Sequence, residues 1–237
     1  MSSDISTLLL TIAIIAVPII LAITLHEASH GYVAWKLGDD TAYRLGRVTF
    51  NPLKHIDPFG TIILPALLYY VSSAAGSPFL FGYAKPVPVN FRQLRNPRRD
   101  MVLVAAAGPG INIVLAMISA LALHLVPQGS AVSGIADQML AISIITNVIL
   151  ALFNMLPLPP LDGGRVAVGL LPYPLSLYLA RLERHGMFIL LAVIFLLPWL
   201  GRQIGMDLDV IGWVLHPLAD YVEGLIYWVT GNNAGGL

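Results

Sequence analysis

The sequence predicts an all-α polytopic membrane protein of about five to six transmembrane helices. Hydrophobic residues make up 57% of the 237 residues and charged residues only 11%, less than half of the roughly 25% that is usual in soluble domains. So few charges cannot cover the surface of a globule of this size. The 21 glycines and 17 prolines also indicate kinked helices and irregular backbone inside the membrane.

The charge balance and the absence of cysteine exclude several classes of function. The chain has 13 Lys and Arg residues against 13 Asp and Glu residues, so no overall basic field exists and nucleic acid is not expected as a partner. It has no cysteine, which excludes disulfides, thiolate metal sites and cysteine nucleophiles. The expected partners are the lipid bilayer and membrane proteins, while the oligomeric state stays open.

Four apolar runs are expected to cross the bilayer, whose hydrocarbon core is about 30 Å thick. The first is not a cleaved signal peptide, because Asp4 is the only charge ahead of it. A fifth stretch, 210–229, carries His216, Asp220 and Glu223, so it is interpreted either as a last span or as an amphipathic surface helix. The four runs are 8–25, 101–126, 135–157 and 187–200.

The run 61–75 is short and contains Pro65. Basic residues flank it on both sides, and positively charged loops prefer the cytoplasm. We therefore expect a re-entrant segment with both ends on the cytoplasmic side, whereas the uncharged loop 127–134 fits the outer face. The whole chain, 1–237, is expected to form one domain, with a core at about 8–165 and C-terminal helices at 166–237.

The pentapeptide His26-Glu27-Ala28-Ser29-His30 follows the first apolar run, and ionisable residues in a membrane helix are costly and usually functional. Residues four apart lie on one face of a helix, so the two imidazoles can bind one metal ion. Glu27 lies on the adjoining turn and is placed to take a proton from water. A shuffled chain would contain roughly 0.002 such pentapeptides. The alternative is a pair of buried histidines that bond backbone groups, with Glu27 as their partner.

A catalytic zinc site usually has three protein ligands and a water molecule, and Asp162 is the expected third ligand. It follows the proline-rich stretch 154–161 and precedes two glycines. Such backbone is tolerated at membrane depth only where it is packed in protein or lines a watery cavity. The alternative is an ordinary helix-ending loop in which Asp162 caps the next helix. His55 is expected in a surface turn, with support of the metal site as its alternative.

Together, the two candidate metal motifs resemble those of the site-2 protease family of intramembrane zinc metalloproteases. The first is HExxH on a membrane helix, and the second is the pattern NxxPxxxxDG. Two weaker similarities support the resemblance, because 108–112 matches the GPxxN of an intervening helix and 81–90 is similar to a small membrane-associated β segment. The second motif consists of Asn154, Pro157, Asp162 and Gly163.

The resemblance implies a compact member of the family and a set of site residues. Residues 51–61 are similar to the subgroup without PDZ or CBS domains, and no room for a PDZ domain separates the GPxxN helix from the aspartate motif. The expected cofactor is one Zn²⁺ per chain, which lowers the pKa of its bound water to about 7. Glu27 is expected to move the proton of that water, and Asn154 to donate to the oxyanion. The expected zinc ligands are His26, His30 and Asp162.

A substrate helix must unwind before it can be cut, and its freed amides need new partners because lipid offers none. Pairing onto a β edge would supply them, and the alternating segment 85–89 suits such an edge. Its prolines cannot donate, so one side of the strand would be closed; a polyproline-like loop is the alternative. Asn112 is expected either to contact substrate or to form a helix–helix hydrogen bond. The edge residues are Lys85, Pro86, Val87, Pro88 and Val89.

The sequence therefore predicts an integral membrane zinc metalloprotease that cleaves transmembrane protein substrates within or near their membrane-spanning segments. The two metal motifs meet most easily if their spans run in the same direction, which one intervening crossing allows. The basic loops place the site nearer the cytoplasmic side of a prokaryotic cell membrane. The alternative is a metal-binding or metal-transporting membrane protein, but the spans offer no regular series of acidic residues for a polar path.

Overall fold

The computed structural model describes residues 2–74, 82–127, 129 and 131–232, and none of these residues is in a strand. The all-α prediction is therefore confirmed for this part of the chain. The long helices are α1 (Ser2–Lys36), α4 (Pro97–Leu123), α5 (Ala131–Asn154), α7 (Leu175–Leu191) and α9 (Val210–Thr230). The shorter ones are α2 (Thr41–Arg44), η1 (Pro52–Lys54), η2 (Pro58–Ile63), α3 (Leu64–Ala74), α6 (Asp162–Leu170), η3 (Ala192–Leu196) and α8 (Leu197–Gln203).

Among the described residues, 4 helical stretches are long and apolar enough to cross a membrane. The fourth is longer than the predicted run because η3 joins α7 and α8 without a break. The predicted total of five to six spans is not confirmed, since α9 is not among the four and the run 61–75 overlaps the shorter apolar segment Pro58–Tyr70. Its last residue, Ala75, lies outside the described residues, and its re-entrant path stays a prediction. The four stretches are Ile5–Lys36, Pro97–Leu123, Ser133–Asn154 and Leu175–Gln203.

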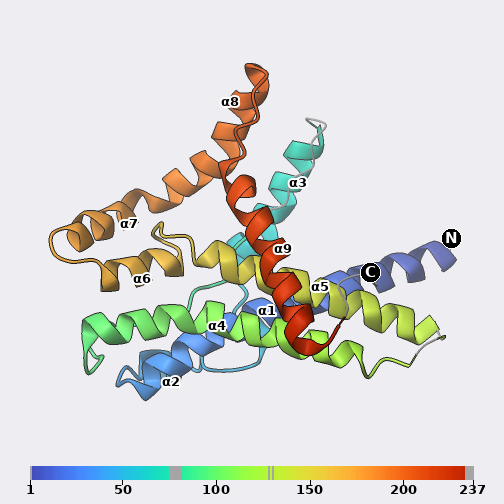
Figure 1. Cartoon of the computed structure of the whole chain (residues 1–237), viewed down its shortest axis with the longest axis horizontal. Coiled ribbons are helices and arrows are strands. Elements are labelled where there is room, and N and C mark those ends of the chain that lie inside the picture. Colours follow the sequence, from blue (N-terminus) through green and yellow to red (C-terminus); the bar gives the residue numbers. More distant parts are fainter. Residues whose placement is uncertain (1, 75–81, 128, 130, 233–237) are drawn as a thin grey trace.

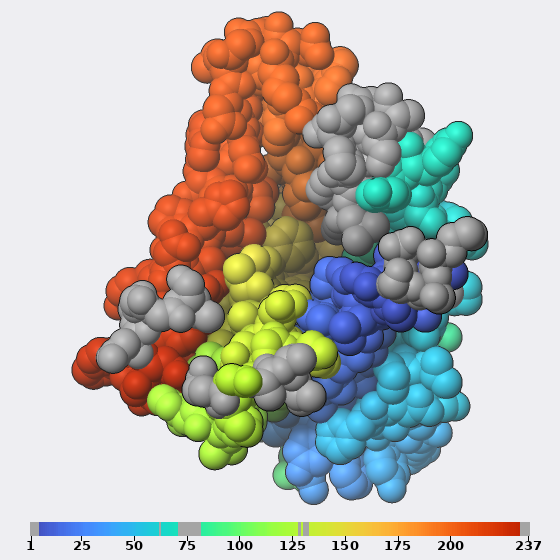
Figure 2. Space-filling model, turned by 90° about the vertical axis from the view of Figure 1, so that its right-hand side faces the viewer, coloured from blue at the N-terminus to red at the C-terminus, as the bar shows by residue number. Residues whose placement is uncertain are grey.

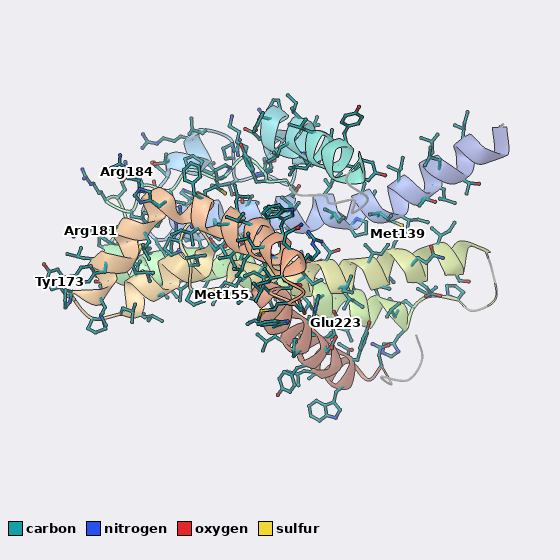
Figure 3. All side chains as sticks on the ribbon, turned by 90° about the horizontal axis from the view of Figure 1, so that it is seen from above. Met139, Met155, Tyr173, Arg181, Arg184 and Glu223 are labelled. Carbon is teal, nitrogen blue, oxygen red and sulfur yellow. The ribbon has the colours of Figure 1, made fainter. Side chains whose placement is uncertain are left out.

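Helices α1, α4 and α5 pack on one another along the long axis of the molecule (Figure 1). Helix α4 runs opposite to α1 and α5, so the end of α1 and the end of α5 lie toward the same side, as one intervening crossing requires. Helix α9 crosses this group steeply, and α7 and α8 extend away from it. Seen from above, Tyr173, Arg181 and Arg184 lie at the end of the molecule opposite the N-terminus (Figure 3).

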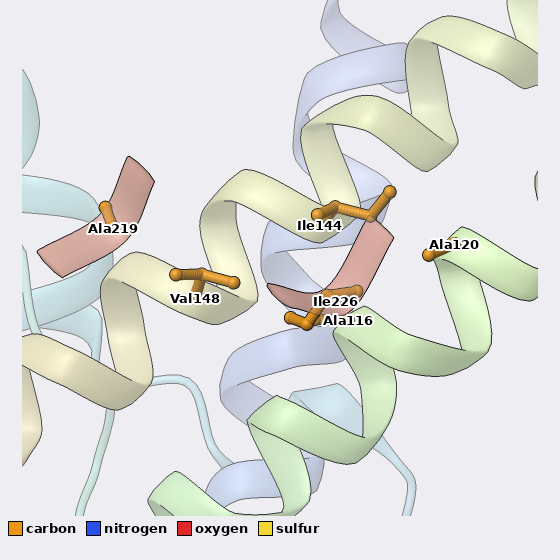
Figure 4. Packing of buried hydrophobic residues seen from close by; sticks show 6 residues of the cluster. All are labelled: Ala116, Ala120, Ile144, Val148, Ala219 and Ile226. Carbon is orange, nitrogen blue, oxygen red and sulfur yellow. The ribbon is translucent and has the colours of Figure 1, made fainter. Parts of the chain in front are cut away.

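Small apolar residues let the central helices approach closely. In membranes, helices associate largely through such close packing, because lipid tails are as apolar as the side chains. Residues of α4, α5 and α9 interlock in one cluster (Figure 4), which holds α4 firmly against α5. The cluster consists of Ala116, Ala120, Ile144, Val148, Ala219 and Ile226.

The predicted β segment is not confirmed, because residues 82–90 run without regular secondary structure. Phe81, the first residue of that segment, lies outside the described residues. Two of its backbone amides bond non-strand segments, since the N–H of Tyr83 donates to the carbonyl of Gly60 in η2 at 3.0 Å and that of Lys85 to the carbonyl of His55 at 2.9 Å. The expected alternation of side chains is present only in part. Val87 is buried, Val89 half-buried and the intervening Pro88 exposed, but Lys85 is exposed like Pro86.

Candidate metal centre

His26 and His30 lie on one face of α1 and meet Asp162, the first residue of α6. Nε2 of His26 lies 3.1 Å from Oδ2 of Asp162, and Nε2 of His30 lies 3.2 Å from the same oxygen. The three residues are buried, and their candidate ligand atoms all lie within 4.8 Å of one another. Neighbouring ligands of a tetrahedral zinc with bonds of about 2.0 Å are about 3.3 Å apart. The donor types and their spacing therefore fit zinc.

The Nδ1 atom of each imidazole lies within hydrogen-bonding distance of an oxygen atom. Nδ1 of His26 lies 2.5 Å from Oδ1 of Asn112, and Nδ1 of His30 lies 2.7 Å from the backbone carbonyl of Val104. A carbonyl oxygen only accepts, so each Nδ1 carries a proton and each Nε2 presents its lone pair toward Asp162. Lone pairs facing a carboxylate repel it unless a cation lies between them, so this arrangement requires a proton or a metal ion.

Helix α4 bounds the site with a glycine. A Cβ atom at Gly108 would lie 2.4 Å from Nε2 of His30 and 2.6 Å from Nε2 of His26, well inside contact distance. Glycine at this position therefore keeps the space in front of both nitrogens open. The first residue of the GPxxN sequence is thus part of the candidate metal centre.

A tight loop, residues 155–161, connects α5 to α6 and places Asp162 in the site. A Cβ atom at Gly163 would lie 2.2 Å from the carbonyl oxygen of Met155, and one at Gly164 would lie 2.3 Å from the nitrogen of Pro159. The two glycines thus let the proline-rich loop fold over the start of α6. Burial opposes ionisation of Asp162, but imidazoles that carry a proton on Nε2 donate hydrogen bonds to the carboxylate, and these outweigh burial and hold the pKa of Asp162 below its ordinary value.

Glu27 contacts the segment that was predicted to bind substrate. The N–H of Val87 donates to its Oε2 at 2.8 Å, and Val87 packs against α1 at Gly31, where an added Cβ would lie 3.0 Å from its Cγ1. Arg47 holds the same segment from the loop after α2, because its Nη2 donates to the carbonyl of Lys85 at 2.6 Å. Residues 85–87 are therefore fixed beside the metal centre.

The surface-turn interpretation of His55 is wrong, because the residue is only 2% exposed. Its Nε2 lies 3.1 Å from the carbonyl of Thr49, and its own carbonyl accepts from Lys85. Burial lowers the pKa of His55, and the positive charge of Arg47 lowers it further, although the bond to Thr49 acts in the opposite direction. His55 thus supports the segment beside the site.

The two asparagines predicted for the site have different surroundings. Asn154 is the last residue of α5, and its amide donates to the carbonyl of Leu150 at 2.9 Å, inside its own helix. Asn112 is fully buried, and it bonds His26 on one side and Asn147 of α5 on the other. The helix–helix bond is therefore present. Sequence reasoning missed Asn147, although a lone asparagine in an apolar run was a usable signal.

A large apolar cavity lies between η2 and α3 on one side and α7, η3, α8 and α9 on the other. Its volume is about 1930 Å³, and Figure 2 shows the hollow between the teal and the orange parts of the surface. Tyr83 and Ile149 contribute to its wall, whereas His26, His30 and Asp162 do not. The cavity thus extends to Tyr83, which precedes the segment beside the metal centre, without containing the candidate ligands.

These features define a class of protein: a helical membrane protein that buries two imidazoles and a carboxylate beside a glutamate. Metal-dependent hydrolases use such a set of residues, because the metal activates a water molecule and the glutamate moves the proton of that water. The high share of hydrophobic residues and the four long apolar helices among the described residues indicate an integral membrane protein.

Comparisons with known proteins identify the family. The model of the family described as "Peptidase family M50" matches residues 123–197. The chain is 42% identical over 189 residues to "Putative zinc metalloprotease YwhC" of Bacillus subtilis, covering 78% of this chain and 80% of that protein. It is 31% identical over 186 residues to "Putative zinc metalloprotease Rip2" of Mycolicibacterium smegmatis, covering 77% and 66% of the two chains. The protein of the same name from Mycobacterium tuberculosis is 30% identical over 211 residues, which cover 89% of this chain and 70% of that protein.

The chain belongs to peptidase family M50 and is a zinc metalloprotease of the site-2 protease type. No solved structure matches the chain significantly.

Proposed function

We propose that this metalloprotease hydrolyses peptide bonds within or near the transmembrane segments of other membrane proteins. The observation that carries the proposal is the convergence of His26, His30 and Asp162 beside Glu27 at the end of a membrane-spanning helix. The three buried side chains would hold one Zn²⁺ per chain. When bound, zinc would lower the pKa of a water molecule to about 7 and polarise the scissile carbonyl.

The remaining side chains would handle the proton and the developing charge. Glu27 would take the proton of the attacking water and deliver it to the leaving amine. Its bond from the N–H of Val87 fixes the orientation of the carboxylate. Asn154 would donate its amide to the oxyanion after exchanging its bond to Leu150. Asn112 would position His26 rather than touch substrate, because its side chain is fully buried.

The segment 85–89 would receive the unwound substrate in an extended form. On one side its amides and carbonyls are already bonded to His55, Glu27 and Arg47. The other side includes Pro86 and Pro88, which have no N–H and so leave mainly carbonyl acceptors, although the carbonyl of Pro86 also lies 3.4 Å from Nη2 of Arg47. A substrate strand would therefore donate its amides to this edge and receive few hydrogen bonds in return.

The apolar cavity offers a place for the membrane-spanning part of the substrate. It opens between α3 and the helices α7 to α9, and Tyr83 on its wall precedes the substrate-binding segment. A substrate helix there would have its unwound end close to Glu27. Basic residues near this end of the molecule, such as Lys36 in the last turn of α1 and Arg181 and Arg184, support a site nearer the cytoplasmic side of a prokaryotic cell membrane.

The proposal is tested with purified protein in detergent and a panel of membrane-spanning peptides. We expect cleavage that a zinc chelator removes and added Zn²⁺ restores. Glu27→Gln should lower the rate about 1000-fold while zinc stays bound. Glu183→Gln is the matched control, because this exposed carboxylate lies away from the metal centre and pairs with Arg165 at 3.4 Å. Cleavage that survives both chelation and Glu27→Gln would refute the proposal, and metal uptake into vesicles that survives Glu27→Gln would favour a transporter.

A further inference from the structure

A chain of buried polar side chains leads from His26 into the contact between α4 and α5. Nδ2 of Asn112 donates to Oδ1 of Asn147 at 2.7 Å and, over a longer 3.3 Å, to the carbonyl of Ala22. Nδ2 of Asn147 donates to the carbonyl of Ser143 at 2.8 Å. Asn112 and Asn147 are 0% and 1% exposed. Both lie in membrane-spanning helices, where buried polar groups are costly and usually functional.

The hydrogen bonds in this series of side chains all run in one direction, and the backbone carbonyl of Ser143 at the far end sets that direction. The backbone carbonyl of Ser143 can only accept, so the NH₂ group of Asn147 must face it and Oδ1 of Asn147 must face Asn112. The NH₂ group of Asn112 then faces Asn147, which leaves Oδ1 of Asn112 for His26. Because that oxygen also only accepts, Nδ1 of His26 carries the proton and Nε2 keeps its lone pair toward Asp162.

Without Asn147, only the longer contact to Ala22 would orient the amide of Asn112. Turned by half a rotation, Asn112 would present its NH₂ group to His26, and the imidazole would carry its proton on Nε2 instead. That proton would occupy the lone pair that binds metal. His30 does not need such a chain, because its Nδ1 faces the backbone carbonyl of Val104 directly.

We propose that Asn147 is a positioning residue that acts through Asn112 to fix the tautomer of His26 for metal binding. The inference rests on the proposed metal role of His26 and deepens it. The apolar cluster around Ala116, Ile144 and Val148 (Figure 4) keeps α4 against α5, so that the two asparagines stay within hydrogen-bonding distance.

The first test is the zinc affinity of variants in detergent, measured by competition with a chromophoric chelator. Asn147→Leu removes both hydrogen-bonding groups at similar volume, and it should weaken zinc binding about 10-fold or more. Ser119→Ala is the matched control, because it removes another buried contact between α4 and α5, the 2.8 Å bond to the hydroxyl of Ser143. That hydroxyl also accepts from Nδ2 of Asn147 over a longer 3.3 Å, but the backbone carbonyl of Ser143 orients Asn147. Ser119→Ala leaves this carbonyl in place, so the variant should bind zinc like the wild type.

A second substitution separates positioning from packing. A carboxylate presents an oxygen whichever way it turns, so Asn112→Asp no longer depends on Asn147 for its orientation. Asn147→Leu should therefore cost about 10-fold in the wild-type background and less than about twofold in the Asn112→Asp background. A purely structural role of Asn147 would give the same loss in both. Asn147→Ser, too short to bridge its two neighbours, is the substitute if the leucine variant does not fold.

The tautomer itself is read by ¹⁵N NMR of histidine-labelled protein without metal, with His26→Gln for assignment. We expect a single Nδ1–H tautomer of His26 in the wild type, a mixture in Asn147→Leu, and no change at His30. An unchanged His26 tautomer, unchanged zinc affinity, or an equal loss in Ser119→Ala would overturn the inference. A wild type that neither binds zinc nor cuts peptides would instead refute the proposed function.

Discussion

Replacing Gly108 with alanine should strongly weaken metal binding, because the added methyl group would enter the space between the imidazoles. The added Cβ would lie 2.4 Å from Nε2 of His30 and 2.6 Å from Nε2 of His26, whereas non-bonded heavy atoms prefer about 3.5–4.0 Å. Each nitrogen would have to retreat by about 1 Å, while zinc sites tolerate only about 0.2 Å. We expect zinc affinity to fall at least about 100-fold, which corresponds to about 2.7 kcal/mol.

Gly110→Ala is the matched control for this change. It lies in the same helix, and nothing lies within 4 Å of its added Cβ, so both variants share the gain in helix propensity of about 1 kcal/mol. Zinc affinity by chelator competition and cleavage of a membrane-spanning peptide are measured for both variants. If Gly108→Ala binds zinc as tightly as Gly110→Ala, Gly108 does not face the metal and the described geometry is wrong.

The contacts of Asp162, Arg47 and His55 lead to three further predictions. Asp162→Asn should lower zinc affinity about 10-fold or more, because it removes the charge that both imidazoles face; an unchanged zinc content after dialysis would contradict this. Arg47→Ala should raise the KM for peptide with little change in kcat, because the segment 85–87 loses the bond to its Lys85 carbonyl; the exposed Arg44→Ala is the control, and equal KM values would argue against the role. Stability should fall as the pH drops through 6.5, because the lowered pKa of His55 means that the unfolded chain takes up a proton that the native protein does not. Thermal unfolding between about pH 8 and pH 5 measures this, and a slope that His55→Gln leaves unchanged would contradict it.

The candidate metal centre was largely predictable because its strongest signals are local. The spacing of His26 and His30 follows from the helical repeat alone, and the irregular backbone before Asp162 marks a residue with a special environment. Their convergence also needed only the direction of three helices. The confirmed all-α architecture has a similar basis, because apolar runs of sufficient length determine membrane helices almost by themselves.

Features that depend on contacts between distant segments were not predictable in the same way. The alternation around Val87 suggested a strand, but a strand needs a partner, and the N–H of Val87 donates to Glu27 instead. Arg47 and Asn147 matter through neighbours far away in sequence, and nothing local shows which way their side chains point. The role of Gly108 became clear only from the approach of α4 to both imidazoles.

Zinc K-edge X-ray absorption of the purified protein tests most directly whether His26, His30 and Asp162 bind one metal ion. We predict imidazole nitrogens at about 2.0–2.1 Å and oxygens at about 2.0–2.2 Å, with the imidazole signal reduced in His26→Gln and an oxygen lost in Asp162→Asn. A bound zinc whose spectrum lacks imidazole, or stays the same in both variants, would contradict the account.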